Sequence, residues 1–73
     1  MVLSKVTMEL TEGHSISVTV EQEEASALLR AFQRDQRCKV IHDVDGSMIC
    51  INLNCIVYMT VEPAGEMKND WAD

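Results

Sequence analysis

The chain is poor in aromatic residues, in proline and in glycine. Among its 73 residues only Phe32, Tyr58 and Trp71 are aromatic, and there are one proline and three glycines. A core without many rings must be built from valine, isoleucine, leucine and the five methionines. A chain of this length forms one domain and buries only about 60% of the surface that its unfolded form exposes. Domains this small commonly gain stability from a disulfide, a metal or self-association.

Basic residues are scarce as well. Six lysines and arginines stand against twelve aspartates and glutamates, which gives a formal net charge of −6. Binding to a phosphate backbone needs clustered cations, so this balance disfavours nucleic acid as a partner. An acidic field instead suits approach to a basic protein surface. Carboxylates on a small domain could also imitate nucleic-acid phosphates, although scattered surface charge is the simpler interpretation.

The sequence has no apolar run long enough for a secretory signal or a membrane span. Its three cysteines, Cys38, Cys50 and Cys55, form an odd set. A secreted protein held by disulfides normally carries an even number. We therefore expect a cytoplasmic protein in which the three thiols are reduced and buried like small hydrophobic side chains.

A zinc site built from the cysteines and His42 is the main alternative for these residues. Cys38 and His42 lie four residues apart in a predicted strand, which separates them by about 13 Å. One tetrahedral ion does not reach both positions. A cysteine nucleophile would need a neighbouring histidine and an orienting group, and the spacing singles out no such set. The sequence thus predicts no metal, no cofactor, no catalytic residue and no enzymatic activity.

Hydrophobic periodicity predicts a hairpin followed by a helix. Residues 2–10 and 15–20 alternate between apolar and polar side chains, and Gly13 lies in the turn between them. From Gln22 the period changes to that of a helix, which we expect to end near Asp35. The apolar stripe of this helix consists of Ala25, Leu28, Leu29 and Phe32.

The last third of the chain is predicted to be β again. Two strands, at 39–44 and 47–53, flank the turn dipeptide Asp45-Gly46. A third strand covers 55–62 and is expected to end at Pro63. The order ββαβββ defines an α+β fold, a small antiparallel sheet with one amphipathic helix packed across one face.

We take residues 1–63 as one α+β domain and residues 64–73 as a polar C-terminal tail that we expect to be mobile. Trp71 is the one aromatic side chain in this tail. A lone tryptophan in a polar segment often acts as an anchor, so Trp71 is expected to dock on a neighbouring subunit.

The last two predicted strands carry apolar side chains on both faces, and a single helix covers only one face of a sheet. We therefore predict a homo-oligomer that buries the second face. The candidate interface consists of Met48, Cys50, Ile56 and Tyr58, with Trp71. If the helix takes that face instead, the interface consists of Val57, Met59 and Val61.

The basic residues gather at the end of the predicted helix. Arg30, Arg34 and Arg37 are spaced as one helical stripe, and Lys39 follows, so four of the six cations fall within ten residues. Arginine binds oxyanions in a bidentate manner, so this stripe is a candidate site for a phosphate, a nucleotide or an acidic partner. The alternative is a solvated face that neutralises the helix C-terminus.

Two segments, KVTMELTEGHSISVTVEQEEASALLRAF and KVIHDVDGSMICINLNCIVYMTV, resemble small uncharacterised proteins encoded by phages and prophages of Gram-positive bacteria. The likeness covers roughly residues 3–62 and lies in the outline: a hairpin with a glycine turn, an E-x-x-x-L-L helix and a second hairpin. It implies no activity. The segment INLNCI is also similar to the end of LytTR-type DNA-binding domains, which are longer and basic.

These observations predict an acidic, non-enzymatic binding protein of phage or prophage origin. It would act as an inhibitor or accessory factor by occupying a surface of a host protein. One alternative is an oligomeric sequestering protein that binds a nucleotide or another anion through the arginine stripe. Another is a structural subunit of a larger assembly.

Overall fold

The computed structural model describes residues 2–66. Its elements follow one another as β1 (Val2–Leu10), β2 (Ser15–Glu21), α1 (Gln22–Gln33), β3 (Cys38–His42), β4 (Met48–Asn52), a short 3-10 helix η1 (Leu53–Cys55) and β5 (Ile56–Glu66). All strand pairs are antiparallel. The predicted α+β class and the order ββαβββ are therefore confirmed.

The strands form two sheets, where the sequence predicted one. A three-stranded sheet has the order β2-β1-β5, and β3 pairs only with β4. The chain turns away after β4 through η1, where the Asn52 side chain accepts a hydrogen bond from the Asn54 backbone N–H at 3.1 Å. The Thr11 N–H then donates to the Cys55 carbonyl at 3.0 Å, which ties this corner to the first hairpin. Because of this corner, β5 pairs with β1 instead of continuing a meander from β4.

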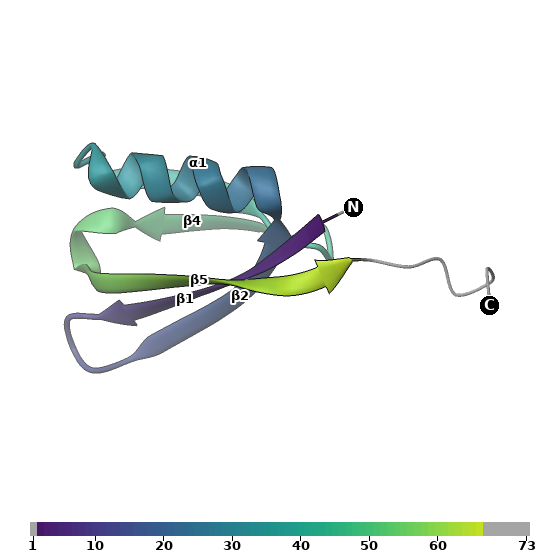
Figure 1. Ribbon diagram of the computed structural model, residues 1–73. Helices are drawn as coiled ribbons and strands as arrows, with labels where there is room; N and C mark the ends of the chain where they lie inside the picture. The colour runs from purple at the N-terminus through teal and green to yellow at the C-terminus, as the bar shows by residue number, and fades with distance from the viewer. Residues whose placement is uncertain (1, 67–73) are drawn as a thin grey trace, which may run out of the picture.

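The three-stranded sheet has one apolar and one polar face. Val6 lies between Val18 and Val61 in the register, and Met8 lies between Ile16 and Met59. These side chains form the inner face, on which both α1 and the β3–β4 hairpin pack (Figure 1). We call the opposite, polar face the sheet outer face; its cross-strand residues are Lys5, Thr7, Glu9, Ser15, Ser17, Thr19, Tyr58, Thr60 and Glu62.

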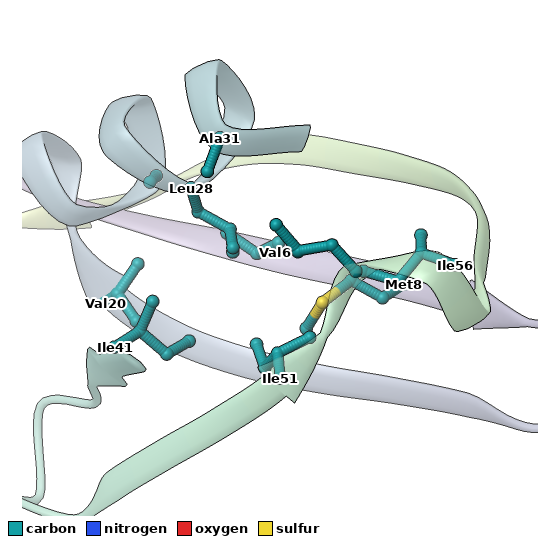
Figure 2. Packing of buried hydrophobic residues seen from close by; sticks show 10 residues of the cluster. Val6, Met8, Val20, Leu28, Ala31, Ile41, Ile51 and Ile56 are labelled. Carbon is teal, nitrogen blue, oxygen red and sulfur yellow. The ribbon is translucent and has the colours of Figure 1, made fainter. Parts of the chain in front are cut away.

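The core is aliphatic, as the scarcity of aromatic residues predicted. Its fully buried side chains are Val6, Met8, Val20, Leu28 and Ile41. Figure 2 shows them converging from the helix, from β1 and β2 and from the β3–β4 hairpin. Among the described residues, Phe32 is the one ring that packs against this cluster, and it is only partly buried. The helix, the three-stranded sheet and the hairpin all bury side chains in this core, and this shared burial helps to hold the separate hairpin on the sheet.

The buried stripe of α1 differs by one position from the predicted one. Ala25 and Leu28 are buried as expected, and the third buried residue is Ala31. Leu29 is 36% exposed. The predicted stripe was wrong at Leu29: the side of the helix that packs on β1, β2 and β3 is centred on Leu28 and includes Ala31 instead.

The helix also ends earlier than predicted, at Gln33 instead of Asp35. Asp35 has a left-handed backbone with φ of 56°, a conformation that terminates helices. The backbone N–H of Gln36 donates to the Ala31 carbonyl at 3.2 Å and closes the last turn. The chain therefore changes direction before Arg37.

Strand β5 continues to Glu66, so the prediction that it ends at Pro63 was wrong. Pro63 pairs with Ser4 and Gly65 pairs with Leu3, with a register shift between the two pairs. A proline is tolerated here because β5 is an edge strand and the irregularity absorbs the missing N–H. Residues 67–73 of the predicted tail, with Trp71, lie outside the described residues.

We expect Leu28→Ala to lower the free energy of unfolding by about 2–5 kcal/mol, because the Leu28 side chain is fully buried on the inner side of α1. Leu29→Ala makes the same chemical change on the neighbouring, partly exposed position and should cost less than half as much. Urea denaturation followed by circular dichroism measures both. Equal losses would contradict the orientation of the helix described above.

Candidate functional site

The β3–β4 hairpin separates its side chains strictly between two sides. Ile41 and Ile51 point into the core. The opposite side is exposed, and we call it the hairpin outer face; its residues are Cys38, Val40, His42, Met48, Cys50 and Asn52. The hairpin is closed by Asp43, whose carboxylate accepts hydrogen bonds from the backbone N–H groups of Asp45 at 3.0 Å and Ser47 at 2.9 Å. This turn sets the register that keeps the two isoleucines inside.

The hairpin outer face is apolar although it faces solvent. Met48 is 71% exposed and Val40 is 43% exposed. No lysine, arginine, aspartate or glutamate belongs to this face. The sheet outer face, by contrast, carries lysine, glutamate and several hydroxyl side chains. The hairpin outer face and the sheet outer face thus differ sharply in chemistry.

One end of the hairpin outer face is hollowed into a shallow depression of about 500 Å³, lined by Arg37, Cys38, Cys50, Asn52 and Asn54. Cys38 is directly opposite Asn52, and Cys50 is opposite Val40. The two cysteines are therefore diagonal neighbours, with Cα atoms about 7–8 Å apart, too far for an unstrained disulfide. They supply two thiols to one surface.

The prediction that the three cysteines are buried was wrong, because all three are exposed free thiols. Cys38 and Cys50 occupy outward positions of the hairpin, and Cys55 ends the 3-10 helix at the corner before β5. Their apolar character suggested core positions. The alternation of the hairpin instead assigns those positions to isoleucine.

The predicted oligomer interface is divided by the structure. Met48 and Cys50 lie together on the hairpin outer face. Ile56 is only 7% exposed and belongs to the core, so it is not available to a partner. Tyr58 is 55% exposed and lies opposite Glu9 on the other sheet. These four residues would share one face only if β4 and β5 were neighbours in one sheet, but β4 pairs with β3 and β5 pairs with β1.

The fallback set lies on β5 and is likewise mixed in exposure. Val57 is exposed and lies between Ile56 and Tyr58, where the pairing of β5 with Glu9 and Leu10 of β1 shifts in register. Met59 packs against the core as a half-buried side chain, and Val61 is exposed at the edge of the inner face. Met59 and Val61 therefore belong to the inner face of the sheet, and the three residues do not form a second apolar face.

Three of the four predicted anion-contact residues come together. Arg30, Arg34 and Lys39 line a second shallow depression, of about 190 Å³, with Ala27, Ala31 and Gln36. Arg37 lies instead at the depression of the hairpin outer face. The left-handed turn at Asp35 breaks the helical spacing on which the predicted stripe depended.

One contact joins residues that sequence reasoning did not connect. The His42 backbone N–H donates to Glu24 Oε2 at 2.9 Å, and His42 Nδ1 lies 3.8 Å from the same oxygen. This contact holds the end of β3 against the first turn of α1. A separation of eighteen residues, with no motif at either end, left no signal for it in the sequence.

Within residues 2–66 no group of three or more histidine, cysteine, aspartate or glutamate side chains is placed to hold a metal ion. The helix in this part of the chain is too short and too polar to cross a bilayer.

No protein family model, no curated protein and no solved structure matches this chain. The resemblance to phage-encoded proteins therefore stays a prediction, and the two depressions and the hairpin outer face stand on the residues of this chain alone.

We expect all three cysteines of the folded monomer to react with a thiol reagent such as Ellman's reagent without denaturant, because each is exposed in the single chain. The unfolded protein should show the same three thiols and no increase. Spectrophotometric titration with and without guanidinium, at a protein concentration at which the chain is monomeric, measures this. A folded monomer with fewer than three reactive thiols would contradict the exposed positions.

Proposed function

We propose that the protein is a non-enzymatic binding protein that acts by occupying a surface of another protein, with the hairpin outer face as its contact surface. The observation that supports this most strongly is the exposed, uncharged face around Met48 and Val40. Burying a large apolar side chain against a partner contributes about 1.5–3 kcal/mol. Methionine adapts its shape readily to a partner surface.

The charges near the two ends of this face are opposite, and they orient a partner. Arg37 lies beside the depression at one end, and Asp43 and Asp45 form the turn at the other. Charged rims of this kind influence orientation and association rate more than affinity. The overall charge of −6 favours a partner whose surface is basic. The resemblance to phage and prophage proteins makes a host protein the proposed partner.

The same face is also suited to a second copy of the chain. If two hairpins pack face to face with their strands antiparallel, Arg37 of one copy approaches Asp45 of the other at both ends of the interface. A two-fold axis repeats each contact, so one favourable pair becomes two. The apolar side chains then cover one another between these ends. We therefore propose that the free protein is a homodimer through the hairpin outer face and that a host partner displaces the second copy when it occupies the same face.

Val40→Asp should convert the dimer to a monomer, because Val40 belongs to the central outward pair of the hairpin and the change adds two like charges to the middle of a two-fold interface. Thr60→Asp is the matched control: it introduces the same carboxylate on the exposed sheet outer face. Sedimentation velocity at micromolar concentration measures both. A monomeric wild-type protein, or equal behaviour of the two variants, would rule out this dimer.

The host-protein proposal is tested with the same pair of variants. Wild type, Val40→Asp and Thr60→Asp are immobilised and exposed to a Gram-positive bacterial extract, and any retained protein is purified and titrated against each by calorimetry. We expect binding to wild type and Thr60→Asp and at least tenfold weaker binding to Val40→Asp. A purified partner that binds Val40→Asp as tightly as wild type would show that another surface makes the contact.

A further inference from the structure

The second depression brings three cations together from two elements. Arg30 and Arg34 come from the last turn of α1 and its C-cap, and Lys39 comes from β3. Lys39 pairs with Ile51 and occupies an inward position of β3, where the alternation calls for an apolar residue. It is half-buried. A lysine at such a position keeps its aliphatic stem against apolar neighbours while its ammonium group reaches the surface.

No described carboxylate makes an ion pair with these three cations. Within residues 2–66 the one close contact between a carboxylate and a basic side chain joins Glu24 to His42, and no side-chain hydrogen bond involves Arg30, Arg34 or Lys39. A role as helix cap does not account for them either, since three of the last four carbonyls of α1 are occupied by backbone donors. The carbonyls of Arg30, Ala31 and Phe32 accept from the backbone N–H groups of Arg34, Gln36 and Asp35, respectively.

The local field at this depression is positive although the protein is acidic. The carboxylates of α1 that lie in its first turn, Glu23 and Glu24, are about 15 Å from Arg34 along the helix. This distance exceeds the Debye length of about 8 Å at physiological ionic strength. Asp35, next to Arg34 in the chain, is the nearest carboxylate in sequence, and one carboxylate against three cations leaves an excess of positive charge. These remaining positive charges repel one another, and an anion relieves that repulsion.

We propose that Arg30, Arg34 and Lys39 bind a phosphate group in this depression. Its volume of about 190 Å³ is smaller than the roughly 300–1,000 Å³ that encloses a drug-sized ligand. The depression thus accommodates a phosphoryl group and leaves the rest of a phosphorylated molecule outside. Arginine offers paired N–H donors that match the oxygens of phosphate. Gln36, on the same rim, adds an uncharged amide donor.

This site is independent of the hairpin outer face, because the two depressions share no lining residue. Arg37 makes the separation testable. It lies in the same short segment as Arg34, is exposed in the same way and carries the same charge, but it lines the other depression. Replacing either arginine by glutamine changes the net charge equally.

Titration with inorganic pyrophosphate at constant ionic strength, followed by proton–nitrogen NMR, tests the proposal. We expect saturable shifts at Arg30, Arg34, Gln36 and Lys39. Arg34→Gln should weaken binding about tenfold, the loss of one charge-assisted contact. Arg37→Gln should leave the dissociation constant within twofold of wild type. Inorganic phosphate should shift the same resonances at higher concentration, and acetate at the same ionic strength should not.

Equal weakening by Arg34→Gln and Arg37→Gln would overturn the proposal, since it would reflect general charge screening. Shifts that rise linearly without saturation would overturn it as well. Thermal unfolding of each variant shows that its fold is intact. If Arg34→Gln lowers the unfolding midpoint, Arg30→Gln replaces it, because Arg30 is an exposed residue of the same depression.

Discussion

The pairing of the first strand with the last is the constraint on which the rest of this structure depends. Strand β1 is bonded on both sides, to β2 and to β5, and it supplies Val6 and Met8 to the centre of the core. Because β5 pairs with β1, the only strand that pairs with β4 in the described chain is β3. The second hairpin is then held by the burial of Ile41 and Ile51, together with the hydrogen bonds from the His42 N–H to Glu24 and from the Val44 N–H to the Thr19 carbonyl. Its other side is left in solvent.

Both proposed binding surfaces follow from this arrangement. The hairpin outer face exists because the hairpin is a separate two-stranded unit whose second side no element of the described chain covers. The cationic depression exists because the start of β3 is packed beside the end of α1, which places Lys39 next to Arg30 and Arg34. The link between α1 and β3, in which Asp35 has a left-handed backbone, lies next to this depression.

Local periodicity was sufficient for most of the elements. Alternation in residues 2–10 and helical spacing after Gln22 depend on which side chains face the core, so they are readable without knowing the partners. Pro63 shows where such reasoning fails. A proline ends a strand only if its N–H is needed there, and at an edge strand with an irregular register it is not. Edge position is a property of the sheet and is invisible in a local pattern.

The sequence by itself determined the α+β class, the element order, an aliphatic core and the clustering of basic residues near the end of the helix, because each follows from composition or from spacing along the chain. Only the tertiary structure decided that β5 joins β1, that Ile56 is buried while Cys50 is exposed, and that Arg37 is parted from Arg34. These outcomes depend on which strands pair across long separations. That choice is made by the packing of the whole core, and similar apolar strands carry no local mark that distinguishes one partner from another.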